Sequence, residues 1–195
     1  MTRPLRRAAA TTVVALALAA AASACSGSDD GGGDEPSGTG GSSSAHPVDT
    51  QVTWGEVTGT LAPADRRHLA TKVGQIVDGW TVAAYLGGDY PRRDFADSWP
   101  GFTRGAREEA HADRSLMSNE DIGSRIDGVE PYRSRVRIDV LAVHRRPVGV
   151  TAHVALTFGT TGEVERRVSV RGRLFLTPTE QGWKVFAYDV TKGRA

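Results

Sequence analysis

The sequence contains a single cysteine, Cys25, among 195 residues. One cysteine cannot form an intrachain disulfide, and it excludes a zinc site that is built from several thiolates. Cys25 directly follows an apolar stretch near the N-terminus. We therefore interpret it as a residue that is modified during export rather than as part of a folded core.

The histidines show neither a helical pair nor the spacing of a short metal-ligand motif. The sequence contains no GxSxG segment, no GxGxxG segment and no phosphate-binding loop. We therefore expect no bound metal and no cofactor. The histidines are His46, His68, His111, His144 and His153.

Acidic residues are absent before Cys25, whereas Arg3, Arg6 and Arg7 lie at the N-terminus. A run of mostly alanine follows and ends in small residues. A basic start, an apolar run and a small-residue end are the parts of a signal peptide. The run is too short for a membrane span, which needs about 20 apolar residues. The sequence therefore predicts a signal peptide over residues 1–24.

Two kinds of cleavage fit the end of this segment. Ala22-Ser23-Ala24 has the small-x-small pattern of ordinary signal peptidase. The same residues followed by Cys25 resemble a bacterial lipobox, although Ala22 stands where leucine is usual. The resemblance implies a diacylglyceryl thioether on Cys25 and a chain anchored by lipid to the extracytoplasmic face of the cell membrane. We favour this lipidation; with ordinary cleavage, the chain would be secreted.

The segment after Cys25 lacks the large apolar residues that build a hydrophobic core. Residues 26–47 consist mainly of glycine, serine, proline and acidic residues, with no aliphatic residue larger than alanine. Such a chain cannot repay its ordering entropy, and a coil of this length reaches about 25 to 30 Å. We therefore assign residues 25–50 to a disordered tether and residues 51–195 to one folded domain.

Helical periodicity dominates the first half of this domain. Residues 51–60 are expected to form a short leading strand or an edge strip. A helix should open at Pro63 and end at Gly87-Gly88, because apolar residues recur at three- and four-residue steps between them. We expect a short helix over 94–98 and a further helix over 104–116, with Thr103 as its N-cap.

The second half alternates with a period of two residues, which is typical of strands. We expect strands over 135–143, 148–158, 164–177 and 183–190, with a turn at Arg145-Arg146-Pro147 between the first two. Short connections favour an antiparallel meander. The sequence thus predicts an α+β fold, in which N-terminal helices cover one face of a curved antiparallel sheet of about four long strands.

The order of these elements, closing on the aromatic segment from Gly182 to Val190, resembles the cone-shaped, cystatin-like superfamily of nuclear transport factor two. More narrowly, DFADSWPGFT, LMSN, GVTAHVALTF and GRLFLT resemble segments of a group of actinobacterial lipoproteins. The superfamily resemblance implies a pocket between the helices and the concave sheet face. Members include isomerases, cyclases and non-catalytic binding proteins, so the resemblance does not select an activity.

Catalysis in such a pocket needs a buried acid–base pair. The expected pocket lining is apolar, which argues against an enzyme. The remaining catalytic candidates are Asp94, His111, Asp113 and Asp189, with Tyr85, Tyr90 and Tyr188 as proton donors. Each has a structural alternative, such as a cap, a solvated helix face or a strand-end ion pair. The residues expected to line an apolar ligand pocket are Trp80, Trp99, Phe102, Val154, Leu156, Phe158 and Phe175.

Arginines recur at even spacing on two of the expected strands. Such a patch suits phosphate or carboxylate groups, whereas a solvated face with cross-strand ion pairs is the alternative. Nucleic acid is not an expected partner, because the chain is exported and no aromatic residues interleave these arginines. The anionic patch consists of Arg135, Arg137, Arg167, Arg171 and Arg173.

From these features we expect a membrane-anchored, non-enzymatic accessory domain. Its partner would be an envelope protein or an apolar or anionic envelope molecule. An isomerase- or cyclase-like enzyme and a structural homodimer are the alternatives.

Overall fold

The computed structural model describes residues 50–195. The predicted signal peptide, the predicted lipidation site at Cys25 and almost all of the predicted tether lie outside the described residues. Within residues 50–195, no helix is both long enough and apolar enough to cross a bilayer.

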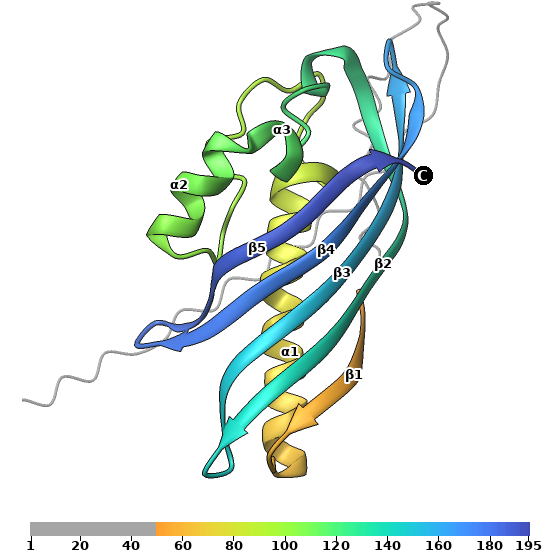
Figure 1. The fold of residues 1–195 in the computed structure, drawn as a ribbon. Helices are drawn as coiled ribbons and strands as arrows, with labels where there is room; N and C mark the ends of the chain where they lie inside the picture. Colours follow the sequence, from red (N-terminus) through yellow and green to blue (C-terminus); the bar gives the residue numbers. More distant parts are fainter. Residues whose placement is uncertain (1–49) are drawn as a thin grey trace, which may run out of the picture. The chain divides into compact units, whose positions relative to one another are not determined.

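Residues 50–195 form an α+β domain in which helices pack against one face of a five-stranded sheet (Figure 1). The strands follow one another across the sheet in chain order, from β1 at one edge to β5 at the other. The expected antiparallel meander is confirmed for β2 to β5, and β1 adds a parallel neighbour to β2. The strands are β1 (Gln51–Thr58), β2 (Ile126–Val143), β3 (Arg146–Gly162), β4 (Arg166–Thr179) and β5 (Gly182–Arg194).

The long helix α1 (Pro63–Thr81) crosses behind the sheet and continues as one π-helical turn, η1 (Val82–Leu86). Proline at its first position costs nothing, because the first N–H groups of a helix have no partner. The predicted end at Gly87 is confirmed, since its N–H donates to the Val82 carbonyl at 2.7 Å. The apolar stripe of this helix is buried against the sheet: Leu69, Val73, Val77, Trp80 and Ala84.

The short helix expected over 94–98 is wrong, because these residues form a turn. The Asp94 carboxylate accepts a hydrogen bond from the Ala96 N–H at 2.9 Å, which closes a local turn instead of capping a helix. The next helix begins as predicted. Thr103 accepts from the Ala106 N–H at 3.3 Å and caps α2 (Arg104–Ala112). The chain breaks at Asp113 before α3 (Arg114–Met117), and a 3-10 turn, η2 (Gly123–Arg125), leads into β2.

Three of the four antiparallel strands, β2, β3 and β5, are longer than the alternation predicted, whereas β4 has the predicted length but begins two residues later. The turn between β2 and β3 is also shifted and lies at His144 and Arg145, whose φ angles are 48° and 65°. Two consecutive residues with positive φ are the geometry of a tight two-residue hairpin, which matches the twist of the strands. Arg146 and Pro147 therefore belong to β3 rather than to the turn.

Candidate functional site

Most of the catalytic candidates from the sequence occupy separate structural positions, and the structure brings together Asp113 and Tyr188, whose hydroxyl donates to the Asp113 carboxylate. Asp94 closes the turn described above. The His111 ring meets the Trp99 ring edge-on, with centroids 6.0 Å apart, and Asp189 forms an ion pair with Arg173. No hydrogen bond within residues 50–195 joins any two of the four acidic and histidine candidates Asp94, His111, Asp113 and Asp189.

The three tyrosine candidates donate hydrogen bonds that hold the fold together. The Tyr85 hydroxyl donates to the Leu116 carbonyl at 2.7 Å, Tyr90 donates to the Tyr85 carbonyl at 2.9 Å, and Tyr188 donates to Asp113 at 2.8 Å. Burial raises the pKa of each tyrosine, and at Tyr188 the Asp113 carboxylate raises it further. All three hydroxyls therefore stay protonated at neutral pH.

Six of the seven residues expected to line an apolar pocket belong to the packed layer between helices and sheet. Each has at most 6% of its surface exposed: Trp80, Trp99, Phe102, Val154, Leu156 and Phe158. The Trp80 and Trp99 indoles both donate to the Met117 carbonyl at 3.2 Å, so their polar ends are satisfied inside this layer. The seventh residue requires a correction: Phe175 is partly exposed and lies beside Thr151 on the opposite face of the sheet.

A surface hollow borders two of these residues. It has a volume of about 580 Å³, lies between the Trp99–Thr103 loop and the β4–β5 hairpin, and includes Arg107 and Lys184 in its lining. Trp99 and Phe102 contribute only small exposed fractions to it. The surface at this loop is therefore mixed, with both polar and apolar groups in its lining.

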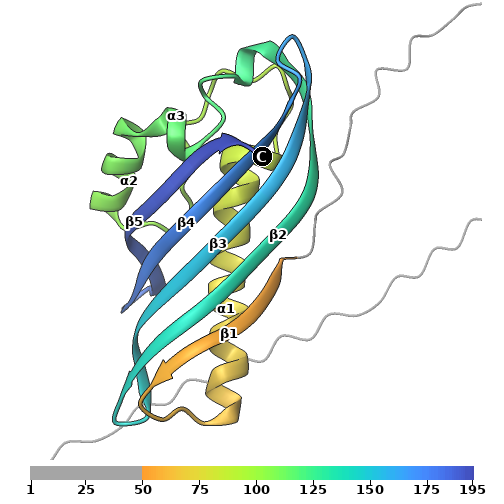
Figure 2. The ribbon, with the colours of Figure 1, turned by 45° about the vertical axis from the view of Figure 1, so that its right-hand side comes forward.

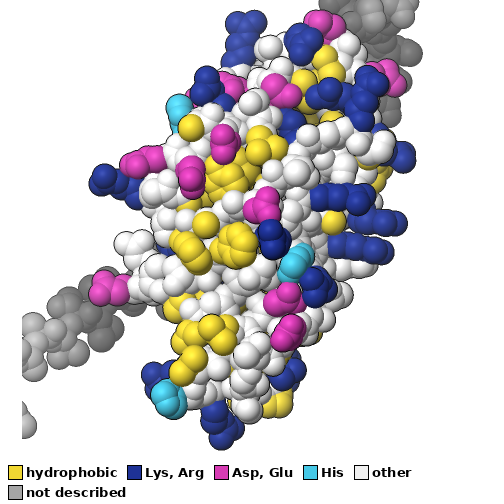
Figure 3. All heavy atoms as spheres, viewed as in Figure 1, with side chains coloured by type: hydrophobic (Ala, Val, Ile, Leu, Met, Phe, Trp, Pro, Cys, Tyr) yellow, Lys and Arg dark blue, Asp and Glu magenta, His cyan; other side chains and the backbone are white. Residues whose placement is uncertain are grey.

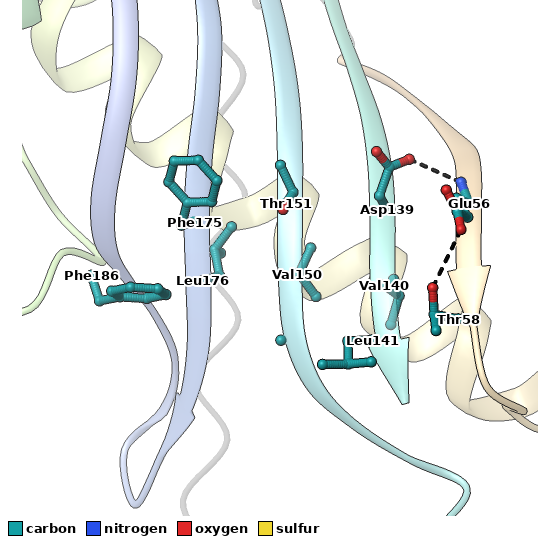
Figure 4. A pocket seen from close by; sticks show the side chains of 11 residues that line it. Glu56, Thr58, Asp139, Val140, Leu141, Val150, Thr151, Phe175, Leu176 and Phe186 are labelled. Carbon is teal, nitrogen blue, oxygen red and sulfur yellow. Dashed lines mark hydrogen bonds between the residues drawn. The ribbon is translucent and has the colours of Figure 1, made fainter. Parts of the chain in front are cut away.

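The face of the sheet that points away from α1 is here called the outer face. It carries a hollow of about 330 Å³, with Phe175 and Phe186 on one side and Asp139 on the other (Figure 4). Gly149 and Thr151 lie between these side chains on β3, and a Cβ added at Gly149 would meet no atom within 4 Å. The hollow thus exists because small residues of the central strand lie between larger neighbours.

The predicted arginine patch also lies on the outer face, where strand register brings its members into rows. Arg135 pairs with Ala155, which in turn pairs with Arg171. In the next row, Arg137 and Arg173 lie on either side of His153. These side chains point to solvent, and Figure 3 shows basic groups gathered at the β2 side of this face.

Two of the predicted patch residues have acidic partners. Arg137 donates to Asp139 at 3.0 Å, and Arg173 pairs with Asp189. His153 also contacts Asp139, with 2.7 Å between its Nε2 atom and the carboxylate. The charges of Arg137 and Arg173 are therefore balanced by Asp139 and Asp189. Such pairing is typical of a solvated face with ion pairs, which was the alternative to an anion-binding patch.

Four arginines on the same face form no ion pair within residues 50–195. One of them, Arg133, lies outside the predicted patch, because the strand begins earlier than the predicted Arg135. The sequence pattern that indicates it is the two-residue spacing of Arg133, Arg135 and Arg137. The four residues, named the arginine cluster from here on, are Arg133, Arg135, Arg167 and Arg171.

Local contacts hold two members of the arginine cluster in place. The Arg171 side chain donates to the Ser169 hydroxyl at 3.0 Å, so it lies along its own strand. The Arg167 guanidinium lies 4.6 Å from the centre of the Tyr132 ring, a cation–π arrangement. Tyr132 is the extra residue of a bulge in β2, which turns its ring across Gly159 of β3.

The arginine cluster and the outer hollow are both open to solvent on the outer face of the sheet. Residues 50–195 contain no group of three or more metal-ligating side chains that could hold an ion. Comparison with family models, curated proteins and solved structures gave no match to the chain.

Proposed function

We propose that the chain is a lipid-anchored, extracytoplasmic and non-catalytic lipoprotein whose domain binds an anionic molecule of the cell envelope through the arginine cluster. The observation that carries the proposal is that four guanidinium groups share one solvent-facing sheet surface and lack acidic partners within the described residues. A charged surface patch of one sign attracts ligands of the other. Guanidinium groups bind phosphate and carboxylate with paired hydrogen bonds.

We also propose the cone-shaped, cystatin-like superfamily of nuclear transport factor two as the origin of the fold. The long helix packed across an antiparallel sheet supports this assignment. The usual ligand position in such a fold is the helix-facing side, which here contains closely packed side chains such as Trp80 and Phe158. The proposed binding surface therefore lies on the other face of the sheet.

The proposal is tested with soluble polyanions and the full-length chain. Inorganic polyphosphate and polyglutamate present phosphate and carboxylate groups respectively, so the pair distinguishes the two anion types. The triple variant Arg133→Gln, Arg135→Gln, Arg171→Gln is expected to bind the preferred polymer at least about tenfold more weakly, because each lost contact is charge-assisted.

A matched variant controls for net charge. Arg93→Gln, Arg107→Gln, Arg145→Gln removes the same three charges from exposed positions outside the arginine cluster. It should retain wild-type affinity apart from a small, salt-sensitive loss. Equal weakening in both triple variants would overturn the proposal, because binding would then follow net charge alone.

The membrane anchor is tested separately. The intact mass of the protein from a membrane fraction should include a diacylglyceryl group that disappears with Cys25→Ser. An unmodified chain that begins at Cys25 and is released to the medium would contradict the anchored location and leave a freely diffusing binding protein.

The outer hollow supports a second candidate, binding of a small apolar ligand. Phe175, Phe186 and Leu141 give it an apolar lining, and Phe186 is 50% exposed. Gly149→Leu should place its side chain in the hollow, since nothing lies within 4 Å of the added Cβ and Gly149 lines the hollow. An apolar fluorescent dye should bind the wild-type chain and lose this binding in Gly149→Leu; unchanged dye binding would exclude this hollow as the site.

A further inference from the structure

The described chain begins beside the arginine cluster. The hydroxyl oxygens of Thr50 and Ser134 share a hydrogen bond of 2.6 Å, and Gln51 pairs in parallel register with Arg135. Figure 2 shows the start of β1 lying along the middle part of β2. The chain that leads back to Cys25 therefore leaves the domain at the same place where the unpaired arginines lie.

The arginine cluster stands on an open sheet surface. None of the three hollows with volumes of about 330, 580 and 300 Å³ is lined by a member of the arginine cluster. Two of the arginines lie on β2 and two on β4, which are about 10 Å apart, and successive rows on one face are about 7 Å apart. Guanidinium groups spaced in this way can reach separate anions that lie in one plane.

Tyr132 adds an exposed aromatic ring to this surface. It is 45% exposed, its hydroxyl donates to Glu130 at 3.2 Å, and its ring lies against the Arg167 guanidinium. Aromatic rings with an apolar body and a polar end are favoured at the boundary between lipid and water. A soluble anionic polymer gains little from such a ring, whereas a phospholipid surface can accommodate it.

We infer that the arginine cluster and Tyr132 dock the domain onto the anionic phospholipid headgroups of the membrane in which the Cys25 anchor lies. This inference deepens the proposed function, on which it rests, by naming its anionic partner as the lipid surface. The two attachments act together, because the anchor holds the domain near the membrane and the arginine cluster contacts the headgroups. Basic residues next to a membrane attachment strengthen binding to anionic lipid in this way.

The test compares two vesicle compositions in the Cys25→Ser background of the full-length chain, so that no thioether lipid contributes. Vesicles of phosphatidylcholine alone and of phosphatidylcholine with phosphatidylglycerol are used in co-sedimentation. Any apolar contribution of the N-terminal segment is common to both compositions. The ratio of the two partition coefficients therefore measures the preference for anionic headgroups, to which the N-terminal Arg3, Arg6 and Arg7 contribute equally in every variant compared.

The wild-type surface should prefer the phosphatidylglycerol vesicles, and this preference should decline as salt is added. Arg133→Gln, Arg135→Gln, Arg171→Gln should reduce the preference about tenfold or more, since each basic group near an anionic surface contributes measurably. The matched variant Arg93→Gln, Arg107→Gln, Arg145→Gln should keep most of it. Equal preferences in the two triple variants would overturn the inference.

The polyanion measurement distinguishes a failure of membrane docking from a failure of the proposed anion binding. If the arginine cluster variant loses polyphosphate or polyglutamate binding but keeps the wild-type vesicle preference, membrane docking is wrong and the proposed anion binding stands. If neither ligand depends on the arginine cluster, both proposals fail. A thermal unfolding midpoint equal to that of the wild-type chain shows that a loss of binding does not come from unfolding.

Discussion

His153 on β3 lies with its Nε2 atom 2.7 Å from the Oδ2 atom of Asp139 on β2. The other oxygen of this carboxylate accepts hydrogen bonds from the Glu56 N–H at 2.9 Å and from Arg137 at 3.0 Å. Burial raises the pKa of Asp139, but these hydrogen bonds and the charges of Arg137 and His153 together hold it below its ordinary value. Asp139 thus links three strands on the outer face.

Asp139→Asn is expected to lower the free energy of unfolding at neutral pH by about 0.5 to 1 kcal/mol, a value reduced for solvent screening near the surface. Because the folded-state pKa is depressed, this stabilisation is complete above the carboxyl pKa of the unfolded chain and is lost as pH falls through the folded-state pKa. Urea unfolding near pH 7 and below about pH 4 measures this change. A difference between wild type and variant that persists unchanged in acid would contradict it.

Gly172 in β4 has a φ of +153°, and a Cβ there would come within 2.1 Å of the Asp189 carbonyl oxygen on β5. Because backbone atoms cannot move aside easily, Gly172→Ala should force the two strands apart. We expect a loss of about 2 to 4 kcal/mol in the free energy of unfolding. Gly149→Ala is the control and should change it by less than about 1 kcal/mol. Comparable losses in both variants would show that the close approach at Gly172 is not the cause.

Periodicity was sufficient to predict α1 and the central parts of the strands, because each of these elements buries one continuous stripe. It failed at the ends of strands, where bulges interrupt the alternation. In β2, the bulge at Tyr132 breaks the period before Arg133, and the first inward-facing residue after it is the polar Ser134, so the apolar alternation becomes visible only from Arg135 onward. The parallel pairing of β1 joins residues more than 80 positions apart, and no local pattern specifies such a pairing.

The face on which a residue lies was harder to predict than the strand that contains it. Leu174, Phe175 and Leu176 are all apolar, so hydrophobicity alone cannot tell which of them points to the helices. The register decides this, because Phe175 pairs with Thr151 whereas Leu174 pairs with the buried Ala152. The arginine rows were more predictable, since even spacing places charged residues of one strand on one face whatever the register.

Phe158 tests whether the helix-facing side of the sheet is filled. Its side chain is fully buried, and its ring centre lies 5.9 Å from that of Tyr85. In a packed core, Phe158→Ala should reduce the free energy of unfolding by about 3 to 5 kcal/mol, because it leaves a cavity. Phe186→Ala, on the outer hollow, should cost far less. A loss below about 1 kcal/mol at Phe158 would instead indicate an open pocket there and would support the enzyme alternative.

Lys192 joins β5 to the segment around α3 from an unusually enclosed position. Its side chain is only 6% exposed, and its ammonium donates to the Ser115 carbonyl at 2.6 Å, the Ser118 carbonyl at 2.7 Å and the Asp121 carboxylate at 2.5 Å. Burial lowers the pKa of Lys192, and the Asp121 carboxylate partly restores it. The Lys192 ammonium therefore satisfies three hydrogen-bond acceptors of the segment 115–121, which does not pair with any strand of the sheet.

Lys192→Met keeps the length of the side chain but removes the donor. It should lower the free energy of unfolding by about 3 kcal/mol, because two carbonyls and one carboxylate lose their partner where water has little access. Lys72→Met, at an exposed position of α1, should change it by less than about 0.5 kcal/mol. Urea unfolding measures both values, and hydrogen exchange should show faster exchange in residues 113–121 of the Lys192 variant. If the two variants lose the same small amount, the enclosed ammonium does not hold this segment on β5.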